Sequence, residues 1–172
     1  PSRLSTIQMN HAAVSPLPAR AAAALGEYAE LLASRGPLAF PELTARLAAL
    51  RETGARLLGV TPELGGASSV SVVPNTTYGL ALVAGGLDWK PGDVVVTTES
   101  EFPANLAPWL DLARHGVEVR RIPTRDGAYR AEEVFAACDE RTRLVSLSLV
   151  AYHTGFVAPA AEVAVFCRER GI

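Results

Sequence analysis

Short runs of β-branched residues alternate with segments of helical length from about residue 67 onward, and this alternation constrains the fold more than any other feature. The β-rich runs are "SSVSVVP", "GDVVVTTE", "GVEVRRIP" and "TRLVSLSLV". The segments after them predict helices over residues 76–86, 104–115, 131–138 and 160–170. Because a crossover helix returns the chain to the starting edge of the sheet, strands joined in this way pair in parallel. The sequence therefore predicts an α/β fold with a mainly parallel sheet and flanking helices.

Two helical patterns precede the sheet region, and each ends at glycine or proline. The first carries Ala, Leu and Tyr at helical spacing and stops at Gly36-Pro37. The second opens at Pro41 and repeats leucine on one face until Pro62. We therefore expect an N-terminal segment with helices, residues 1–66, ahead of the sheet.

The last predicted helix closes with "RERGI", in which Gly171 is the expected C-cap and Ile172 the expected first residue of another buried strand. A parallel sheet that stopped at this point would expose an unpaired edge. The sheet domain of residues 67–172 is therefore expected to be incomplete, truncated before its next strand. Further sequence or a partner chain would complete it.

Charge, cysteine content and hydropathy narrow the class of protein. A net charge of −2 over 172 residues provides no basic stripe for nucleic acid. Cys138 and Cys167 are too few for a disulfide framework and lack metal-site spacing, so we interpret them as reduced structural thiols. No apolar run approaches the roughly 18 residues that a membrane helix needs. We expect a cytoplasmic protein without a metal site that binds neither nucleic acid nor membrane.

Three loops follow predicted strands, and ligands of open parallel sheets bind beyond the carboxyl ends of strands. They are "PNTTYG", "ESEFPAN" and "AYHTG". The first places small polar residues at a helix start, where free backbone N–H groups and the helix dipole favour a phosphate. The same residues are also ordinary helix caps without a ligand. The glycine-rich dinucleotide and P-loop fingerprints are absent, which leaves a nucleotide-binding doubly wound domain as a weak alternative.

Four segments in chain order resemble the class V aminotransferase family, and the resemblance covers essentially the whole chain. They are "NHAAVSPLP", "VVPNTTYGL", "PGDVVVTTESEFPANLAPW" and "TRLVSLSLVAYHTGFVAPAAEVAVFCRERG". The family contains fold type I pyridoxal-phosphate enzymes, among them cysteine desulfurases, kynureninases and isopenicillin N epimerase-like proteins. The resemblance implies pyridoxal 5'-phosphate as cofactor, an amino acid as substrate and a homodimer, with the sheet as part of the large cofactor-binding domain.

The resemblance also implies roles for individual residues in the first two loops. "NTT" matches the turn that holds the cofactor phosphate, which points to Thr76 and Thr77. Phe102 stands where many desulfurases place a histidine stacked on the cofactor ring. Phenylalanine can still stack on that ring but cannot transfer a proton. This departure favours the kynureninase-like and epimerase-like branches over the desulfurases, and a core aromatic is the alternative interpretation of Phe102.

Further positions match the family less specifically, and each has an ordinary structural alternative. Asn105 is expected either to face the cofactor or to serve a local capping role. Tyr152 is expected near the cofactor's 3-hydroxyl. His153 is expected to contact substrate or to be an ordinary loop histidine. Asn10 and His11 match a segment near the substrate pocket, or they cap the start of the first helix.

The groups at the chemical centre of the family are not found in this sequence. Pyridoxal-phosphate catalysis needs a lysine amine and, in this fold, an aspartate beside the pyridinium nitrogen. The one lysine, Lys90, lies in "LDWKPGD" ahead of a strand, at the opposite end of the sheet from the ligand loops. We interpret it as a solvated turn residue. The family places both groups beyond residue 172, so we expect no catalytic residue in this chain and no activity from it alone.

Two hypotheses account for this gap. In the first, the chain is the N-terminal portion of a longer class V enzyme that acts on an amino acid. In the second, it is a natural short form, a non-catalytic half-domain that docks on a partner chain. The sequence favours the first, because domains usually end in exposed segments with few contacts rather than at an expected buried strand. Transaminase, desulfurase, lyase and epimerase activities all remain open.

Overall fold

The computed structural model describes residues 15–172, and the chain divides into two compact units. The first unit is Pro1–Val72 and the second is Val73–Ile172. The division between residues 66 and 67 that the sequence suggested stays a prediction.

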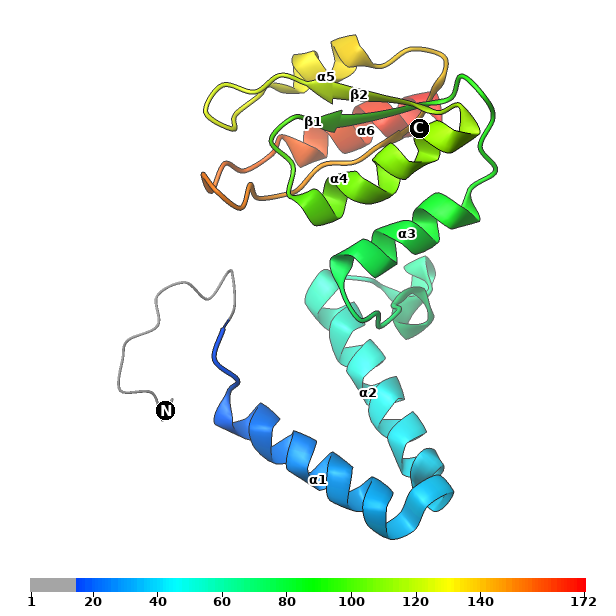
Figure 1. Cartoon of the computed structure of the whole chain (residues 1–172), viewed down its shortest axis with the longest axis vertical. Coiled ribbons are helices and arrows are strands. Elements are labelled where there is room, and N and C mark those ends of the chain that lie inside the picture. The colour runs from blue at the N-terminus through cyan, green and yellow to red at the C-terminus, as the bar shows by residue number, and fades with distance from the viewer. Residues whose placement is uncertain (1–14) are drawn as a thin grey trace. The chain divides into compact units, whose positions relative to one another are not determined.

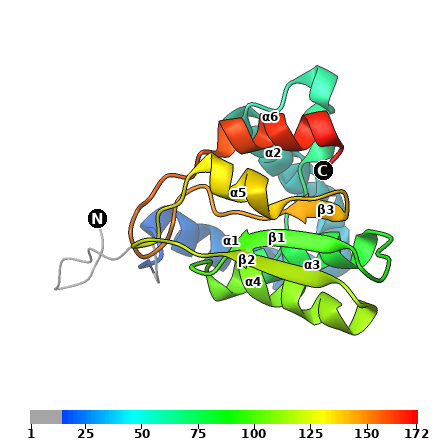
Figure 2. The same ribbon diagram turned by 90° about the horizontal axis from the view of Figure 1, so that it is seen from above.

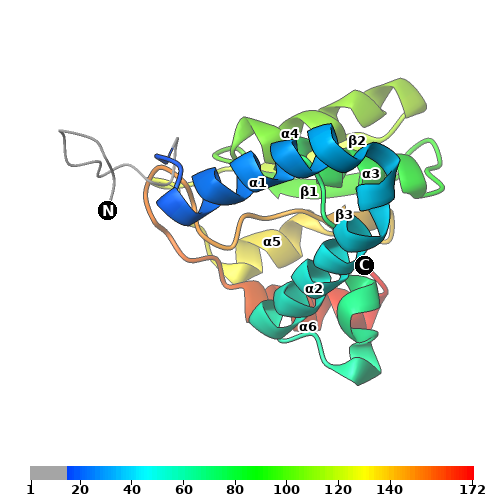
Figure 3. The ribbon, with the colours of Figure 1, turned by 90° about the horizontal axis from the view of Figure 1, so that it is seen from below.

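Two helices make up most of the described part of the first unit, residues 15–72. Helix α1 (Ala19–Arg35) continues through a short 3₁₀ helix (Gly36–Ala39) into α2 (Phe40–Leu58), as Figure 3 shows. The predicted ends are confirmed, because Gly36 follows α1 with φ of 48° and Gly59 caps α2 in the left-handed region. Helix α1 has no buried residue, and Ala55 is the one buried residue of α2. Large apolar side chains of the two helices stay exposed: Leu25, Tyr28, Phe40, Leu47, Leu50, Leu57 and Leu58.

The strand predicted from "SSVSVVP" is wrong. The chain there forms a 3₁₀ helix (Gly66–Ser69) and then an irregular segment. The Arg51 guanidinium donates to three carbonyls of this segment: Nε lies 3.1 Å from the Ala67 oxygen and 2.7 Å from the Val70 oxygen, and Nη2 lies 3.1 Å from the Ser68 oxygen. The β-branched composition favours a strand, but a strand forms only where another one pairs with it. Within the described part of the chain, none pairs with this segment.

The second unit contains a three-stranded parallel sheet, which confirms the predicted α/β fold with parallel pairing. Its strands are β1 (Val94–Thr98), β2 (Glu118–Ile122) and β3 (Thr142–Val145), in the order β2-β1-β3. The central β1 pairs in parallel with both neighbours, with an irregularity against β3 after Val94. Strand β3 is shorter than the predicted run, because the chain leaves the sheet after Val145 and forms a hairpin bridge between Val150 and Val157.

Helices cover both faces of this sheet. On one side lie α3 (Thr76–Gly86) and α4 (Pro103–Leu110), and on the other lie α5 (Ala131–Ala137) and α6 (Ala160–Arg170), as Figure 2 shows. All four match the predicted helices, and a 3₁₀ helix (Asp111–His115) extends α4. Successive side chains of a strand point to opposite faces. The core on the α5 and α6 side therefore takes Val94 and Val96, and the core on the α3 and α4 side takes Val95.

The direction of β1 fixes where the loops meet. Strand β1 points toward the edge of the sheet from which α4 departs, and α3 runs back from the same edge before the chain enters β1 (Figure 1). Helices α3 and α4 pack against each other. Their N-termini therefore face the carboxyl edge of the sheet, together with the loop that follows β3.

An ion-pair network ties the strands together at the opposite, amino edge. Arg120 of β2 donates to Glu118 at 2.7 Å and to Asp139 at 2.8 Å, and Nη1 donates to the Ala137 carbonyl at 3.0 Å. Arg141 approaches Asp139 at 3.0 Å. The hydrogen bond from Arg120 is the main reason that the pKa of Asp139 falls to about 2.

Replacing Asp139 by asparagine should remove part of the acid sensitivity of folding. The pKa of Asp139 is about 2 in the folded protein, whereas an unfolded aspartate has a pKa of about 3.9. The unfolded chain therefore binds more protons between these values, and the free energy of unfolding falls as the pH drops through this window. Urea unfolding at a series of pH values should show a shallower dependence in Asp139→Asn than in the wild type. The exposed Glu140→Gln variant is the control, and equal slopes in all three proteins would contradict the role of Asp139.

Candidate functional site

The N-terminus of α3 is the first part of the candidate site, and its sequence explains its geometry. Asn75 is extended, with φ of −164°, and its Oδ1 accepts the Tyr78 N–H at 2.8 Å. The Asn75 carbonyl accepts the Gly79 N–H at 3.2 Å. Asn75 is thus the helix cap that its residue type favours. Across residues 15–172 no group accepts the backbone N–H of Thr76 or Thr77, and both side chains are exposed. Two amides and two hydroxyls are therefore open at the positive end of an 11-residue helix.

An exposed aromatic pair forms the second part of the site. Phe102, directly before α4, is 48% exposed, and Tyr152 in the loop after β3 is 62% exposed. Their ring centroids lie 5.0 Å apart in an edge-to-face arrangement with an interplanar angle of 81°. The His153 ring lies 4.8 Å from that of Tyr152. Phe102 is thus not a core aromatic, and the structure brings together three residues that the sequence singled out separately.

Asn105, in the first turn of α4, is buried rather than exposed like this pair. Its side chain is buried, with Nδ2 donating to Glu101 at 2.9 Å and Oδ1 accepting from the Ser146 hydroxyl at 2.7 Å. It makes no side-chain cap of α4. Both polar ends of the amide are therefore engaged within the protein, and direct contact with a cofactor stays a prediction.

Only a small cavity lies under the aromatic pair. Its volume is about 10 Å³, roughly the space of one water molecule. Its lining residues are Thr98, Ser100, Glu101, Phe102, Tyr129, Ser148, Ala151, Tyr152 and Phe156. Burial raises the pKa of the Tyr129 phenol to about 12, and the charge of Glu101 acts in the same direction. A planar ligand would therefore lie against the outer faces of Phe102 and Tyr152 rather than beneath them.

A hairpin turn at residues 125–128, which the sequence did not predict, lies against the loop that carries Tyr152. We call residues 150–157 the tyrosine loop; in it the Ala151 N–H donates to the Phe156 carbonyl at 2.8 Å. A bridge between Arg125 and Ala128 closes the neighbouring turn, in which Asp126 and Gly127 have φ of 52° and 77°. A Cβ on Gly127 would lie 2.9 Å from His153 Nε2, so this turn touches the tyrosine loop. An Asp-Gly pair is a hairpin signal, and it could have revealed this turn from the sequence.

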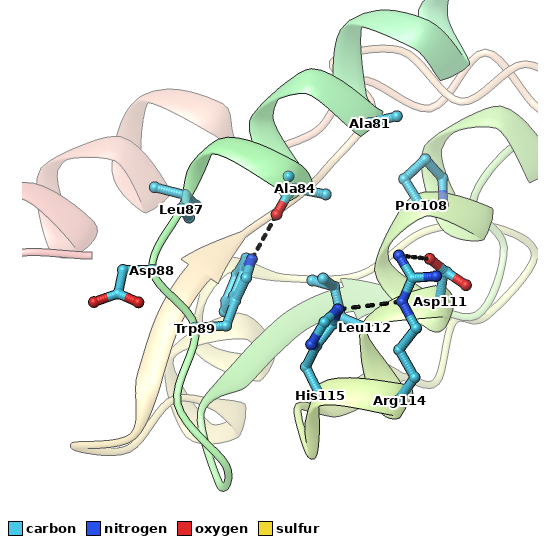
Figure 4. Close-up of a pocket in the computed structure, with 11 residues that line it drawn as sticks. Ala81, Ala84, Leu87, Asp88, Trp89, Pro108, Asp111, Leu112, Arg114 and His115 are labelled. Atoms are coloured by element: carbon cyan, nitrogen blue, oxygen red, sulfur yellow. Dashed lines mark hydrogen bonds and ion pairs between the residues drawn. The ribbon is translucent and has the colours of Figure 1, made fainter.

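A larger cavity lies at the other end of the sheet and does not belong to this site. Its volume is about 380 Å³, and it is bounded by the end of α3, Trp89 and the 3₁₀ helix after α4 (Figure 4). Trp89 Nε1 donates to the Ala84 carbonyl at 2.7 Å. Arg114 pairs with Asp111 at 2.9 Å and donates to His115 at 3.2 Å. These polar groups are thus largely directed at one another.

Lys90 lies near this amino end of the sheet, as the sequence predicted. It is exposed, and its backbone N–H donates to Asp93 Oδ2 at 2.9 Å in the turn before β1. Asn10 and His11, which the sequence placed near the substrate, lie outside the described residues. Cys138 and Cys167 are free thiols, and burial raises the pKa of each.

Metal sites and membrane spans can be assessed over residues 15–172. Within that range no three His, Cys, Asp or Glu side chains are grouped so as to hold a metal ion. None of the helices described there has the length and apolar character needed to span a bilayer.

Comparison with known families gives the site its context. The sequence model of the Aminotransferase class-V family matches residues 7–172. The chain therefore belongs to the class V aminotransferase family, and the resemblance found from its loops is confirmed. Pyridoxal phosphate is the cofactor of this family, and one solved relative, a C-DES variant at 31% identity, carries glycine covalently linked to its PLP cofactor.

Several relatives carry the name of cysteine desulfurase. A probable cysteine desulfurase of Methanothermobacter thermautotrophicus is 30% identical over 172 residues, which cover 96% of this chain and 41% of that protein. One from Klebsiella pneumoniae is 36% identical over 135 residues, 76% of this chain and 32% of that protein. The chain thus spans less than half the length of these relatives. The desulfurase branch, which Phe102 did not favour, is well represented among them.

Solved structures support the fold assignment. A complex of the cystine C-S lyase C-DES with its reaction product cysteine persulfide matches with a TM-score of 0.76 at 30% identity, covering 88% of this chain and 40% of that one. The cysteine desulfurase CsdA of Escherichia coli matches with a TM-score of 0.67 at 26% identity, covering 77% and 33%. The sheet with its flanking helices is therefore part of a fold type I large domain, as predicted.

Alanine at Gly127 should destabilise the fold more than alanine at Gly155. Both glycines have positive φ, 77° and 73°, but only at Gly127 would a Cβ meet neighbours, His153 and Thr154, within about 3 Å. The backbone conformation alone costs about 1–2 kcal/mol for a residue with a Cβ. Urea unfolding should show this loss for Gly155→Ala and a larger one for Gly127→Ala. Equal losses would mean that the side chains of His153 and Thr154 move away from the added Cβ without a cost in free energy.

Proposed function

We propose that this chain supplies the phosphate-binding and ring-covering part of a pyridoxal-phosphate enzyme that acts on a sulfur-containing amino acid. The observation that carries the proposal is the N-terminus of α3, where the backbone N–H groups of Thr76 and Thr77 are open beside two exposed hydroxyls. A dianionic phosphate suits four such donors at the positive end of a helix. Membership of the class V family supports the same ligand.

Each loop of the carboxyl edge takes a separate part of the cofactor in this proposal. Thr76 and Thr77 bind the phosphate through amide and hydroxyl donors. Phe102 covers one face of the pyridine ring, and Tyr152, edge-on to Phe102 with a centroid distance of 5.0 Å, keeps the phenylalanine ring in place. When bound, the cofactor supplies an electron sink for a carbanion on the substrate. The lysine that this chemistry requires is not supplied at this edge, since the one lysine of the sequence is Lys90, in the turn before β1.

The names of the relatives support a sulfur-containing substrate. They include cysteine desulfurases and a cystine C-S lyase whose product is cysteine persulfide. Phe102 has no group that can move a proton, so any proton transfer at this end of the site falls to Tyr152, to His153 or to residues outside this chain. The absence of a proton-transferring group on Phe102 favours cleavage of a carbon–sulfur bond by elimination over a mechanism that needs an acid at position 102.

We also propose that the enzyme is a cytoplasmic homodimer. Support for the location comes from the two free thiols and from the desulfurase relatives. Support for the dimer comes from the family resemblance and from the many exposed leucines of α1 and α2, which are typical of surfaces that pack against other chain segments or subunits.

Valine at Thr76 and at Thr77 should weaken binding of the phosphorylated cofactor selectively. Each substitution removes one hydroxyl donor and keeps the size of the side chain, so the affinity for pyridoxal 5'-phosphate should fall about tenfold per residue. The affinity for pyridoxal, which has no phosphate, should stay unchanged. Fluorescence titration of the full-length apo-protein measures both affinities. Thr53→Val in α2 is the control, and an equal loss for both ligands in the Thr76 and Thr77 variants would overturn the phosphate assignment.

Incubation of the full-length protein with cysteine and with cystine tests the activity. The expected result is release of sulfide or persulfide, with visible absorbance of the bound cofactor that is lost on reduction with borohydride. Alanine, which lacks a carbon–sulfur bond, serves as the control substrate. Cofactor binding without sulfur release from either substrate would restrict the proposal to cofactor binding, and absence of cofactor uptake would reject it.

A further inference from the structure

Glu101 makes three hydrogen bonds that no part of the proposed function uses. Its side chain is buried, with the residue 9% exposed, and it directly precedes Phe102. Oε1 accepts the Ser148 backbone N–H at 2.7 Å. Oε2 accepts the Ser148 hydroxyl at 2.6 Å and Asn105 Nδ2 at 2.9 Å. One carboxylate thus joins the turn after β1, the first turn of α4 and the segment after β3.

These bonds continue into the core of the second unit. Asn105 Oδ1 accepts from the Ser146 hydroxyl at 2.7 Å, and the oxygen of that hydroxyl accepts from Trp109 Nε1 at 3.0 Å. Trp109 is 1% exposed and packs on the α3 and α4 face of the sheet. Ser146 also donates its backbone N–H to the Val96 carbonyl at 2.9 Å. The carboxylate is therefore connected to groups that the sheet and the core hold rigidly.

Neutral donors surround this carboxylate. No Arg, Lys or His of residues 15–172 forms an ion pair with Glu101, and the polar side chains that share its small cavity, Thr98, Ser100, Tyr129 and Ser148, are all neutral hydroxyl groups. Hydrogen bonds to an ionised acceptor are stronger than those between neutral groups, and their directions constrain the donors. The hydrogen bonds of Glu101 are therefore suited to hold the turn after β1 and the segment after β3 in a fixed relative position.

Burial alone does not position the aromatic pair, because Phe102 is 48% exposed and Tyr152 is 62% exposed. Phe102 is attached directly to Glu101, and Tyr152 follows Ser148 by four residues in a loop whose other end is tied by the Ala158 N–H to the Leu149 carbonyl at 2.9 Å. The bonds from Glu101 to Ser148 therefore join the starts of the two segments that present the rings.

We propose that Glu101 is a positioning residue, which fixes the tyrosine loop against the turn after β1 and so sets the place of Phe102 relative to Tyr152. The proposal rests on the proposed function only in taking these rings as the cover of the cofactor. The connection between the loops is a property of the protein without any ligand, and it can be tested in that state.

Glu101→Gln in the full-length protein is the first test. Glutamine keeps the size of the side chain but presents an NH₂ group to donors, so at least one of the three bonds is lost. Hydrogen–deuterium exchange of the apo-protein should be about tenfold faster at the Ser148 amide and through residues 149–156. Exchange in β1 and β2 should remain at the wild-type rate. Unchanged exchange in the loop, or equal acceleration throughout the sheet, would overturn the proposal.

A matched control and a milder variant keep the result interpretable. Glu99→Gln alters an exposed carboxylate two residues away that accepts the Thr124 N–H at 2.8 Å and, within residues 15–172, forms no hydrogen bond with the tyrosine loop. It should leave exchange of residues 148–156 unchanged. Ser148→Ala removes the hydroxyl bond and keeps the amide bond. It should give a smaller acceleration in the same segment, and it replaces Glu101→Gln if that variant does not fold.

Cofactor affinity separates this proposal from the proposed function. Glu101→Gln should lower the affinity for pyridoxal and for pyridoxal 5'-phosphate by the same factor, about three- to tenfold. The contact of Phe102 with the pyridine ring is lost in both cases, whereas the phosphate contact is kept. Equal affinity of Glu101→Gln and wild type for both ligands would show that Glu101 does not position the rings. If the wild-type protein binds neither ligand, the proposed function fails, and the exchange measurement still decides whether Glu101 connects the loops.

Discussion

The burial of β1 between two neighbouring strands and two helical layers is the constraint on which the second unit depends. All five of its residues are buried, and its three valines contribute in alternation to the two cores. Because the pairing is parallel on both sides, every loop that leaves a strand at its carboxyl end reaches the same edge. This geometry brings Phe102 and Tyr152 to one edge of the sheet, and Thr76, which follows no strand, reaches the same edge because α3 packs against α4. The chemistry proposed for the chain thus follows from how one short strand is packed.

The two edges of the sheet use polar groups differently. At the amino edge, arginines and carboxylates form a partly exposed network around Arg120, Glu118 and Asp139. At the carboxyl edge, the Glu101 carboxylate is buried and held by neutral donors from Ser148 and Asn105. Charge pairs in water contribute little and tolerate change, whereas a buried carboxylate loses much when a donor is removed. The Glu101 arrangement, next to the candidate site, is therefore the more sensitive of the two to substitution.

Much of the fold could be predicted from the sequence, and the part that could not depends on contacts between distant residues. The parallel sheet, its four helices and the Asn75 cap follow from local periodicity and residue type. The strand over "SSVSVVP" failed because strand formation requires a partner, and Arg51, 16 to 19 residues away, engages the carbonyls instead. Glu101 escaped notice because its partner Ser148 is 47 residues distant, and nothing local marks a glutamate as buried. The sequence singled out the exposed members of the candidate site, and the structure added the residues that connect them.

The hydrogen bonds from Arg51 to Ala67, Ser68 and Val70 have a consequence for colloidal behaviour. A segment rich in valine and serine, with Val72 exposed, is the kind of sequence that recruits identical segments from other molecules into growing cross-β stacks. The guanidinium occupies the oxygens through which such stacking would begin, and it places a positive charge beside them. A single arginine of α2 thus keeps three carbonyls of this stretch from pairing with another strand.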